Sequence, residues 1–283
     1  MKKNIVLVIL IVALVATAAL GFAACNKKND VVKVIDIKIT DESYAFCVNK
    51  ADTELLASVN AYIAQIKANG TFDAIVNNYF GDGTPAKIES AAAGTANALV
   101  VATNAAFEPF EYLDGNKFCG IDMEIAKGLA DYLGKALVIK NIEFDSIFSE
   151  INAGTADIGM AGITVTAARE ELVTFTSTYY AASQMVVVKA DDTTFDACKT
   201  AEDVEKILKE LPATTKIGVQ KGTTGNFYVE GDEDWGFDGL TAECKSYSTA
   251  ALAIQDMING NINYVIVDEA PAKKITAKMN ALA

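Results

Sequence analysis

The chain has 283 residues, which is long enough for one large or two medium domains with hydrophobic cores. Its 37 acidic and 24 basic residues give a net charge of −13, which argues against a nucleic acid or an anionic membrane surface as the partner. The sequence contains no histidine, which removes Ser-His and Cys-His nucleophile pairs, the usual zinc ligands and the commonest general base, so we expect no catalytic residue, metal or cofactor.

The first 24 residues have the features of a signal peptide. Two lysines precede an apolar run that starts at Ile5, and the small residues Ala23 and Ala24 stand before Cys25. This pattern is typical of a bacterial lipoprotein signal, whose cysteine is lipidated and becomes the new N-terminus, with residues 25–31 as a tether. An uncleaved membrane helix is the alternative, since about 20 apolar residues can span a bilayer. Either way, the rest of the chain lies outside the cytoplasm.

Residues 32–81 read like the end of a domain. "VVKVIDIKI" and "SYAFCVNK" have the composition of strands, and a helix is expected from about Asp52 to Lys67. A second helix follows, with Thr71 expected as its N-cap and Gly81 as its end. The small, polar stretch 82–97 then has no period and is predicted to be a surface linker.

From Ala98 onward, short apolar strands alternate with amphipathic helices. The expected strands are 98–104, 136–144, 156–162, 183–190, 216–220 and 264–268, and the expected helices are 121–133, 145–154, 200–211, 249–258 and one that starts at Pro271. This alternation predicts an α/β protein of two lobes, each with a mainly parallel or mixed sheet covered by helices. Four cysteines, at 47, 119, 198 and 244, form no C-x-x-C pair, and their pairing cannot be read from the sequence.

Ligands of α/β sheets collect at the carboxyl ends of strands and at helix N-termini, and four such places carry polar or aromatic side chains. They are "TNAAFEPFEY" with Asn104 and Phe107, "AGITVTAAR" with Gly162, Thr164 and Arg169, "QKGTTGN" with Gln220 and Thr224, and "VIVDEAP" with Asp268. Each has a structural alternative: Arg169 as a surface charge, Asp268 as a helix cap, the phenylalanines as core. A guanidinium and a carboxylate fixed in one cleft would match the two charged ends of a free amino acid.

These motifs resemble those of a known family. "VVATNAAFEPFEYLDGNKFCGIDMEIAKGLADYLG", "FDSIFSEINAGTADIGMAGITVTAARE", "FTSTYYAASQMVVVK", "KIGVQKGTTG" and "YVIVDEAPA" together resemble the family 3 solute-binding proteins of bacterial polar amino-acid ABC importers, over residues 97–283. The resemblance implies a two-lobed periplasmic-binding-protein type II fold, a polar α-amino acid as ligand, a membrane permease as partner, and a lipid-anchored monomer outside the cytoplasm. It implies no enzymatic activity.

The segment "SYAFCVNKADTELLASVNAYIAQIKANGTFDAIVNNYFG" resembles the end of those proteins, yet here it comes first. The chain therefore looks circularly permuted, with the usual ends joined through residues 82–97. The large lobe would be 44–187, and the small lobe 32–43 plus 190–283, with the lobe crossings near 187–191 and 38–44. The alternative is that residues 32–81 are the remnant of a duplicated upstream domain.

The resemblance also assigns roles. Arg169 should hold the ligand's α-carboxylate, helped by Thr164 and the backbone near Gly162, and Asp268 should take the α-ammonium group. Phe107 and Phe144 correspond to aromatic walls, and Gln220 and Thr224 to contacts from the small lobe.

The side-chain pocket is less defined. Relatives that bind basic side chains carry an acid at the position of Asn104, so the amide there favours a polar uncharged ligand such as glutamine. Glu108 or Glu111 could supply a charge instead, or face solvent. Two other classes share the fold: amino-acid sensors that act through a separate partner, and periplasmic cyclic-acid dehydratases.

Overall fold

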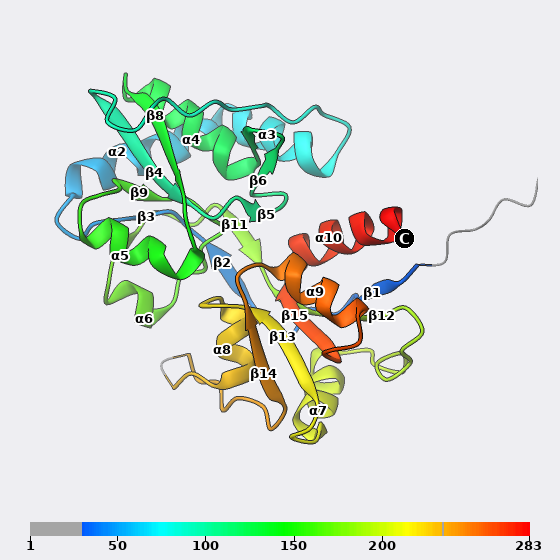
Figure 1. Ribbon diagram of the computed structural model, residues 1–283. Helices are drawn as coiled ribbons and strands as arrows, with labels where there is room; N and C mark the ends of the chain where they lie inside the picture. The colour runs from blue at the N-terminus through cyan, green and yellow to red at the C-terminus, as the bar shows by residue number, and fades with distance from the viewer. Residues whose placement is uncertain (1–29, 234) are drawn as a thin grey trace, which may run out of the picture.

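The computed structural model describes residues 30–233 and 235–283, so the expected signal sequence and Cys25 lie outside the described residues. The described chain forms two lobes, each built around a five-stranded sheet (Figure 1). We call the part around the sheet β10-β3-β9-β4-β8 the large lobe and the part around the sheet β1-β12-β15-β13-β14 the small lobe.

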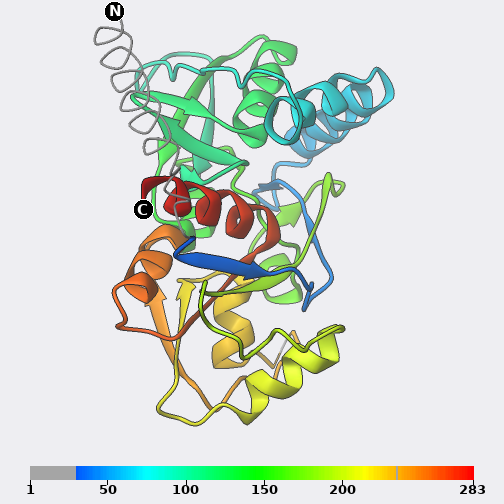
Figure 2. The same ribbon diagram turned by 90° about the vertical axis from the view of Figure 1, so that its right-hand side faces the viewer.

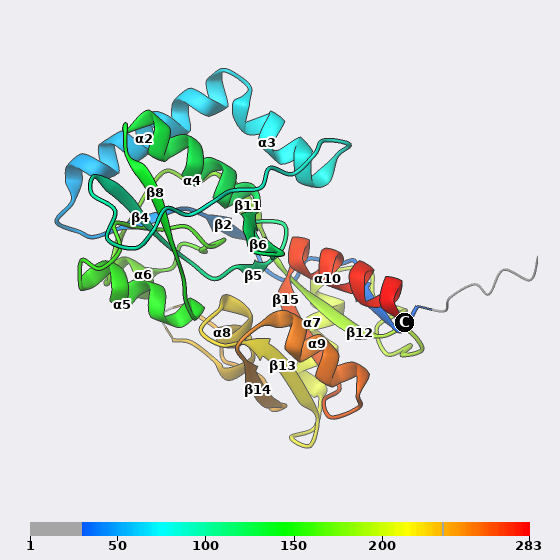
Figure 3. The ribbon, with the colours of Figure 1, turned by 45° about the horizontal axis from the view of Figure 1, so that its top comes forward.

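The large-lobe sheet is mixed. Its strands in spatial order are β10 (Thr174–Phe175), β3 (Cys47–Val48), β9 (Ile158–Gly159), β4 (Ala98–Thr103) and β8 (Ala136–Asn141), of which β4 runs parallel to both β8 and β9. Helices α2 (Thr53–Ala68), α3 (Thr71–Phe80) and α4 (Ile121–Tyr132) gather on one side of this sheet (Figure 3). The short helices η1 (Phe144–Ser146), α5 (Ile147–Asn152) and α6 (Ala167–Glu170) lie on the other, and β5 (Ala106–Phe107), β6 (Glu111–Asp114) and β7 (Lys117–Cys119) form a small separate sheet.

The small-lobe sheet consists of β1 (Val32–Ile35), β12 (Gln184–Lys189), β15 (Tyr264–Asp268), β13 (Lys216–Gln220) and β14 (Glu243–Tyr247). Its two faces are covered by α9 (Ala250–Ile258) with α10 (Glu269–Leu282), and by α7 (Ala201–Glu210) with α8 (Thr224–Glu230). Alternation along β12 explains this double cover: Val187 belongs to the core under α9 and α10, whereas Val186 and Val188 belong to the core under α7.

Most expected helices are confirmed within two residues, and α7 has the predicted capping box between Thr200 and Asp203. Two predicted helix starts were wrong. The N-cap of α3 is Gly70, with a φ of +79°, and Thr71 is already helical, because the amide of Thr71 is bound by the side chain of Asn69. The last helix begins at Glu269, two residues before Pro271, since proline fits anywhere in a first turn where no amide donor is needed.

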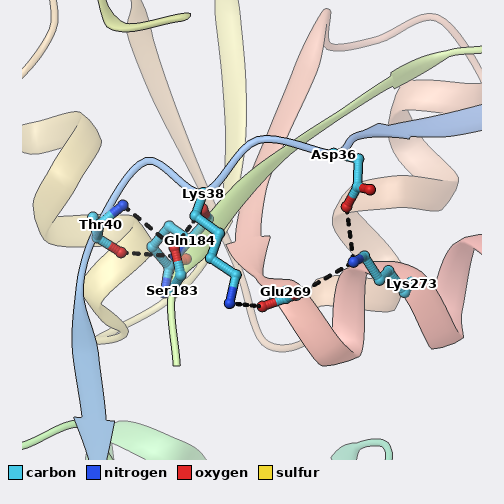
Figure 4. Close-up of polar contacts among 7 residues, drawn as sticks. All are labelled: Asp36, Lys38, Thr40, Ser183, Gln184, Glu269 and Lys273. Atoms are coloured by element: carbon cyan, nitrogen blue, oxygen red, sulfur yellow. Dashed lines mark hydrogen bonds and ion pairs between the residues drawn. The ribbon is translucent and has the colours of Figure 1, made fainter. Parts of the chain in front are cut away.

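Two chain segments connect the lobes. Strands β2 (Glu42–Tyr44) and β11 (Tyr180–Ala182) pair antiparallel in a two-stranded sheet, and residues 36–41 then run beside the start of β12. Figure 4 shows this crossing, where Gln184 N donates to Thr40 Oγ1 over 2.7 Å. In addition, Ile39 N donates to Gln184 O over 3.0 Å. Since β12 pairs with β1 and β15 from Gln184 onward, the second crossing precedes β12, a few residues earlier than expected.

The start of β1 lies against the end of α10, as Figure 2 shows. The side chain of Asn280 joins them: its Oδ1 accepts from Val31 N (2.9 Å) and Val32 N (3.1 Å), and its Nδ2 donates to Val32 O (2.9 Å). Both ends of the described chain therefore meet in the small lobe.

Among the described residues, no helix is long and apolar enough to cross a membrane, and no group of His, Cys, Asp or Glu could hold a metal ion. The cysteines at 47, 119, 198 and 244 are unpaired thiols in this structure.

Candidate functional site

The four strand ends singled out in the sequence meet between the lobes around one narrow cavity, which leaves about 10 Å³ of space for the centre of a water-sized molecule. The cavity is lined by Phe107, Glu111, Phe144, Ala161, Gly162, Thr164, Arg169, Gln220, Thr223, Thr224 and Asp268. Eight of the nine predicted ligand-binding residues are in this lining. The ninth, Asn104, lies directly behind it, where its Oδ1 accepts a hydrogen bond from Gln220 Nε2 over 3.0 Å.

Arg169 is the only arginine in the sequence, and its side chain is buried in the cavity wall. The helix that carries it starts at Thr166, whose hydroxyl accepts from Arg169 N over 3.2 Å. The guanidinium donates to two carbonyl oxygens, those of Thr164 (2.7 Å) and Gly222 (2.9 Å), and lies 5.4 Å from the ring centre of Phe144. Burial lowers the pKa of Arg169 to about 10. Within the described chain no carboxylate lies at ion-pair distance from this guanidinium, which leaves room for an external anion.

Asp268 ends β15 and is also buried. It occupies the N-cap position of α10, but its side chain makes no capping hydrogen bond and instead accepts from the hydroxyl of Tyr44. Burial and the nearby carboxylate of Glu42 raise the pKa of Asp268 above its usual range. The capping alternative is therefore excluded by the geometry, and the carboxylate faces the cavity.

The backbone at Gly162 is held in a conformation that favours glycine, with a φ of +52°. An added Cβ would come within 2.9 Å of the Phe107 ring, so a larger residue would displace an aromatic wall. Gly162 N donates to the buried carboxylate of Asp122 over 2.9 Å, and Asp122 also accepts from Tyr179. These contacts fix the loop that presents Thr164.

Glu42 was not predicted from the sequence. It is buried at the start of β2, where it accepts from the hydroxyls of Thr40 (2.6 Å), Thr164 (2.7 Å) and Thr224 (2.8 Å). A hydroxyl has one hydrogen, so Thr164 and Thr224 can only accept hydrogen bonds from whatever enters the cavity. The sequence carried one sign that Glu42 is buried: it stands two residues before Tyr44 on one strand, so the two side chains share a face.

Glu111 lines the cavity, whereas Glu108 lies outside it and pairs with Lys278. Glu111 is fully buried, and neither of its carboxylate oxygens has a hydrogen-bond partner among residues 30–233 and 235–283. Burial, followed by the charges of Asp122 and Asp268, raises its pKa well above the usual range. The lining thus contains two acidic residues, Glu111 and Asp268, and one basic residue, Arg169.

The model of the bacterial extracellular solute-binding proteins, family 3, matches residues 99–264, more than half of the chain. The chain belongs to this family. It is 28% identical over 194 residues to the "Arginine-binding extracellular protein ArtP" of Bacillus subtilis (strain 168), an alignment that covers 62% of this chain and 71% of that protein. It is 30% identical to the "Probable histidine-binding protein" of Neisseria gonorrhoeae, over 63% of this chain and 62% of that one.

Solved structures agree on the fold. Holo ArgBP from T. maritima superposes with a TM-score of 0.53 and 30% identity, covering 64% of this chain and 74% of that one. The ancestral amino acid-binding protein AncCDT-1, a precursor of cyclohexadienyl dehydratase, superposes with a TM-score of 0.54 and 27% identity. That superposition covers 63% of this chain and 73% of AncCDT-1. This family 3 solute-binding protein thus has the mixed-sheet α/β fold of type II periplasmic binding proteins. The family model starts at residue 99 and therefore leaves out β3, α2 and α3, which come earlier in the chain and also belong to the large lobe.

Proposed function

We propose that the protein is an extracytoplasmic substrate-binding protein that captures a polar α-amino acid between its lobes and delivers it to the permease of an ABC importer. The observation that carries this proposal is the buried guanidinium of Arg169, which hydrogen-bonds two carbonyl oxygens and pairs with no carboxylate of the described chain. A buried charge without an ionic partner is costly, and a ligand carboxylate would offset that cost. The names of the relatives, which include arginine- and histidine-binding proteins, support the same ligand class.

In this proposal the α-carboxylate binds Arg169 through two parallel hydrogen bonds, and the α-ammonium binds Asp268. Thr164 was expected to help hold the carboxylate, but its hydroxyl donates to Glu42, so we assign its oxygen to the ammonium instead. Phe107 and Phe144 pack on the ligand's aliphatic part. Arg169 belongs to the large lobe and Asp268 to the small lobe, so a bound amino acid joins the two and favours closure.

The unpartnered carboxylate of Glu111 supports a ligand with a cationic side chain. Such a group would give both oxygens of Glu111 their missing donors and balance the carboxylates around the cavity. This argument replaces the preference for glutamine that Asn104 suggested, because Asn104 is already engaged by Gln220.

Circular permutation is part of the proposal. Asn280 holds the start of β1 against the end of α10, so the described ends are close enough to have once been continuous. The helices α2 and α3 complete the large lobe that β4 to β11 build, and Tyr79 of α3 donates to Glu124 of α4 over 2.6 Å. A duplication remnant would be expected to leave the large lobe complete without these elements.

We also propose a lipid anchor at Cys25, supported by the small residues before it and the apolar run that precedes them. The anchor would keep the protein on the outer face of the membrane, where a permease could receive its ligand.

A second function is favoured by one observation. A buried carboxyl group that lines a cavity and has a raised pKa can act as a general acid, and Glu111 has these properties. The similarity to a dehydratase precursor makes the dehydration of a cyclic acid the reaction to test.

The first experiment is thermal unfolding of the purified protein against a panel of single amino acids. A ligand at 100 times its Kd stabilises the folded state by about 2.7 kcal/mol, which raises the midpoint by roughly 5–10 °C. We expect this shift with arginine or another cationic amino acid. Arg169→Met should abolish it for every amino acid, and Glu111→Gln should reduce it for cationic ligands while sparing glutamine.

Lys209→Met is the matched control, because it removes one positive charge from the exposed pair between Lys209 and Glu205 within α7, outside the cavity. It should leave the shift unchanged. A folded Arg169→Met protein that still responds to amino acids would refute the carboxylate assignment.

A further inference from the structure

Glu42 hydrogen-bonds to three different parts of the molecule. Thr40 belongs to the crossing segment, Thr164 to the large lobe beyond β9, and Thr224 is the first residue of α8 in the small lobe. The bonds from Thr164 and Thr224 end on the same oxygen, Oε2, at 2.7 and 2.8 Å. One carboxylate oxygen thus joins the two walls of the cavity.

The neighbouring contacts tie Glu42 to both connections between the lobes. Thr40 Oγ1 accepts from the backbone of Gln184, and Gln184 Nε2 donates to Thr224 Oγ1 over 3.0 Å. Figure 4 shows Thr40 and Gln184 facing each other at the crossing. Glu42 itself lies on β2, whose partner strand β11 precedes Gln184. A rotation of the lobes about these segments would separate Thr164 from Thr224, whereas Thr40 would move with Glu42.

We propose that Glu42, Thr164 and Thr224 form a latch that stabilises the closed arrangement of the lobes independently of ligand, with Glu42 as a positioning residue. Opening breaks at least one charge-assisted hydrogen bond to Oε2, so the latch raises the population of the closed form. Because only that form presents both Arg169 and Asp268, the latch also raises the apparent affinity. This second consequence rests on the proposed amino-acid binding, and the first does not.

The test measures the radius of gyration of the unliganded protein by small-angle X-ray scattering, together with ligand affinity by calorimetry. Thr224→Val keeps the shape of the side chain and removes the donor, so we expect a larger unliganded radius and an affinity about tenfold weaker. Thr224→Ser, which keeps the hydroxyl, should restore both values. The double variant Glu42→Ala with Thr224→Val should open no further than Glu42→Ala alone, because both changes break the same bond.

Lys38→Met is the control, since it removes the exposed pair between Lys38 and Glu269 at the same crossing and should change neither value. A Thr224→Val protein that loses affinity while keeping the unliganded radius of the unchanged protein would overturn the latch and leave a direct ligand contact. An unchanged radius and affinity would overturn it as well. If no amino acid binds the unchanged protein, the proposed function fails, and the unliganded radius still decides the latch.

Discussion

The buried charged side chains of the described chain all belong to one region: Glu42, Glu111, Asp122, Arg169 and Asp268. Three of them line the cavity, and the other two accept hydrogen bonds from its lining: Asp122 from Gly162, and Glu42 from two threonines. Burying ionisable groups costs stability, so their concentration at one place marks where the fold gives up stability for binding. The choice of arginine rather than lysine at residue 169 fits a planar, bidentate partner such as a carboxylate.

Unfolding at different pH values tests this burial. Burial raises the pKa of Asp122 to about 7, and it also raises the pKa of Glu111 well above its usual range. A carboxyl whose folded pKa is raised stabilises the protein at low pH, and this contribution is lost as the pH rises through the folded pKa. We therefore expect the free energy of unfolding, measured with urea, to fall from pH 5 to pH 8, by up to about 1.4 kcal/mol per pH unit for one such group.

Asp122→Asn should flatten this dependence, because the amide keeps an acceptor for Gly162 without titrating. A stability that rises between pH 5 and pH 7 would contradict the proposed burial of neutral carboxyl groups.

Most ligand-site residues could be predicted because each follows a strand or starts a helix, and strand ends converge in this fold class. Glu42 could not, since a charged residue at the start of a three-residue strand is typical of the surface, and its hydrogen-bond partners Thr164 and Thr224 lie far away in the sequence. The orientation of Glu111 could not be predicted either. Strand β6 is half exposed, and the alternation of side chains along a strand does not say which of its two faces is covered.

At the scale of the elements, one side chain hydrogen-bonds the start of β1 to α10. Caps and glycines define where α2, α4 and α7 begin and end, and those helices were predictable. The hydrogen bonds between Asn280 of α10 and the start of β1 could not be predicted, because no local pattern reveals them.

Asn280→Ala should remove three hydrogen bonds between α10 and β1 and lower the free energy of unfolding by about 1–3 kcal/mol. Urea unfolding measures the loss, and the ligand-induced shift should persist because the cavity is distant from Asn280. Gln255→Ala is a control on the neighbouring helix α9, where an exposed amide makes a single 3.3 Å bond and should cost little. Equal stabilities of the Asn280 variant and the unchanged protein would show that β1 is held by its pairing with β12 alone.

At the scale of the whole molecule, the order of segments can be tested directly. A chain that starts at Thr95, runs to Ala283, continues through a short glycine linker into Asp30 and ends at Gly94 restores the segment order of the family. We expect it to fold with the same ligand-induced rise in midpoint, because the new cut lies in an exposed turn and every buried contact is kept. Circular dichroism measures whether this chain folds, and thermal unfolding measures the ligand-induced rise in its midpoint.

Deletion of residues 32–81 provides the opposite test. It removes buried side chains of the large-lobe core, among them Tyr44, Phe46 and Val59, and should leave no stable fold. A deleted chain that folds and binds would favour the duplication remnant over permutation.

Arg169 has one more consequence. Because no other arginine occurs in the sequence, a dicarbonyl reagent that modifies guanidinium groups has a single target in the whole molecule. That target is enclosed by Phe144, Phe148 and Phe227, and it opens to solvent only when the two halves part. The rate at which the reagent labels Arg169 therefore measures how often the cleft opens, and the measurement needs no introduced cysteine or dye.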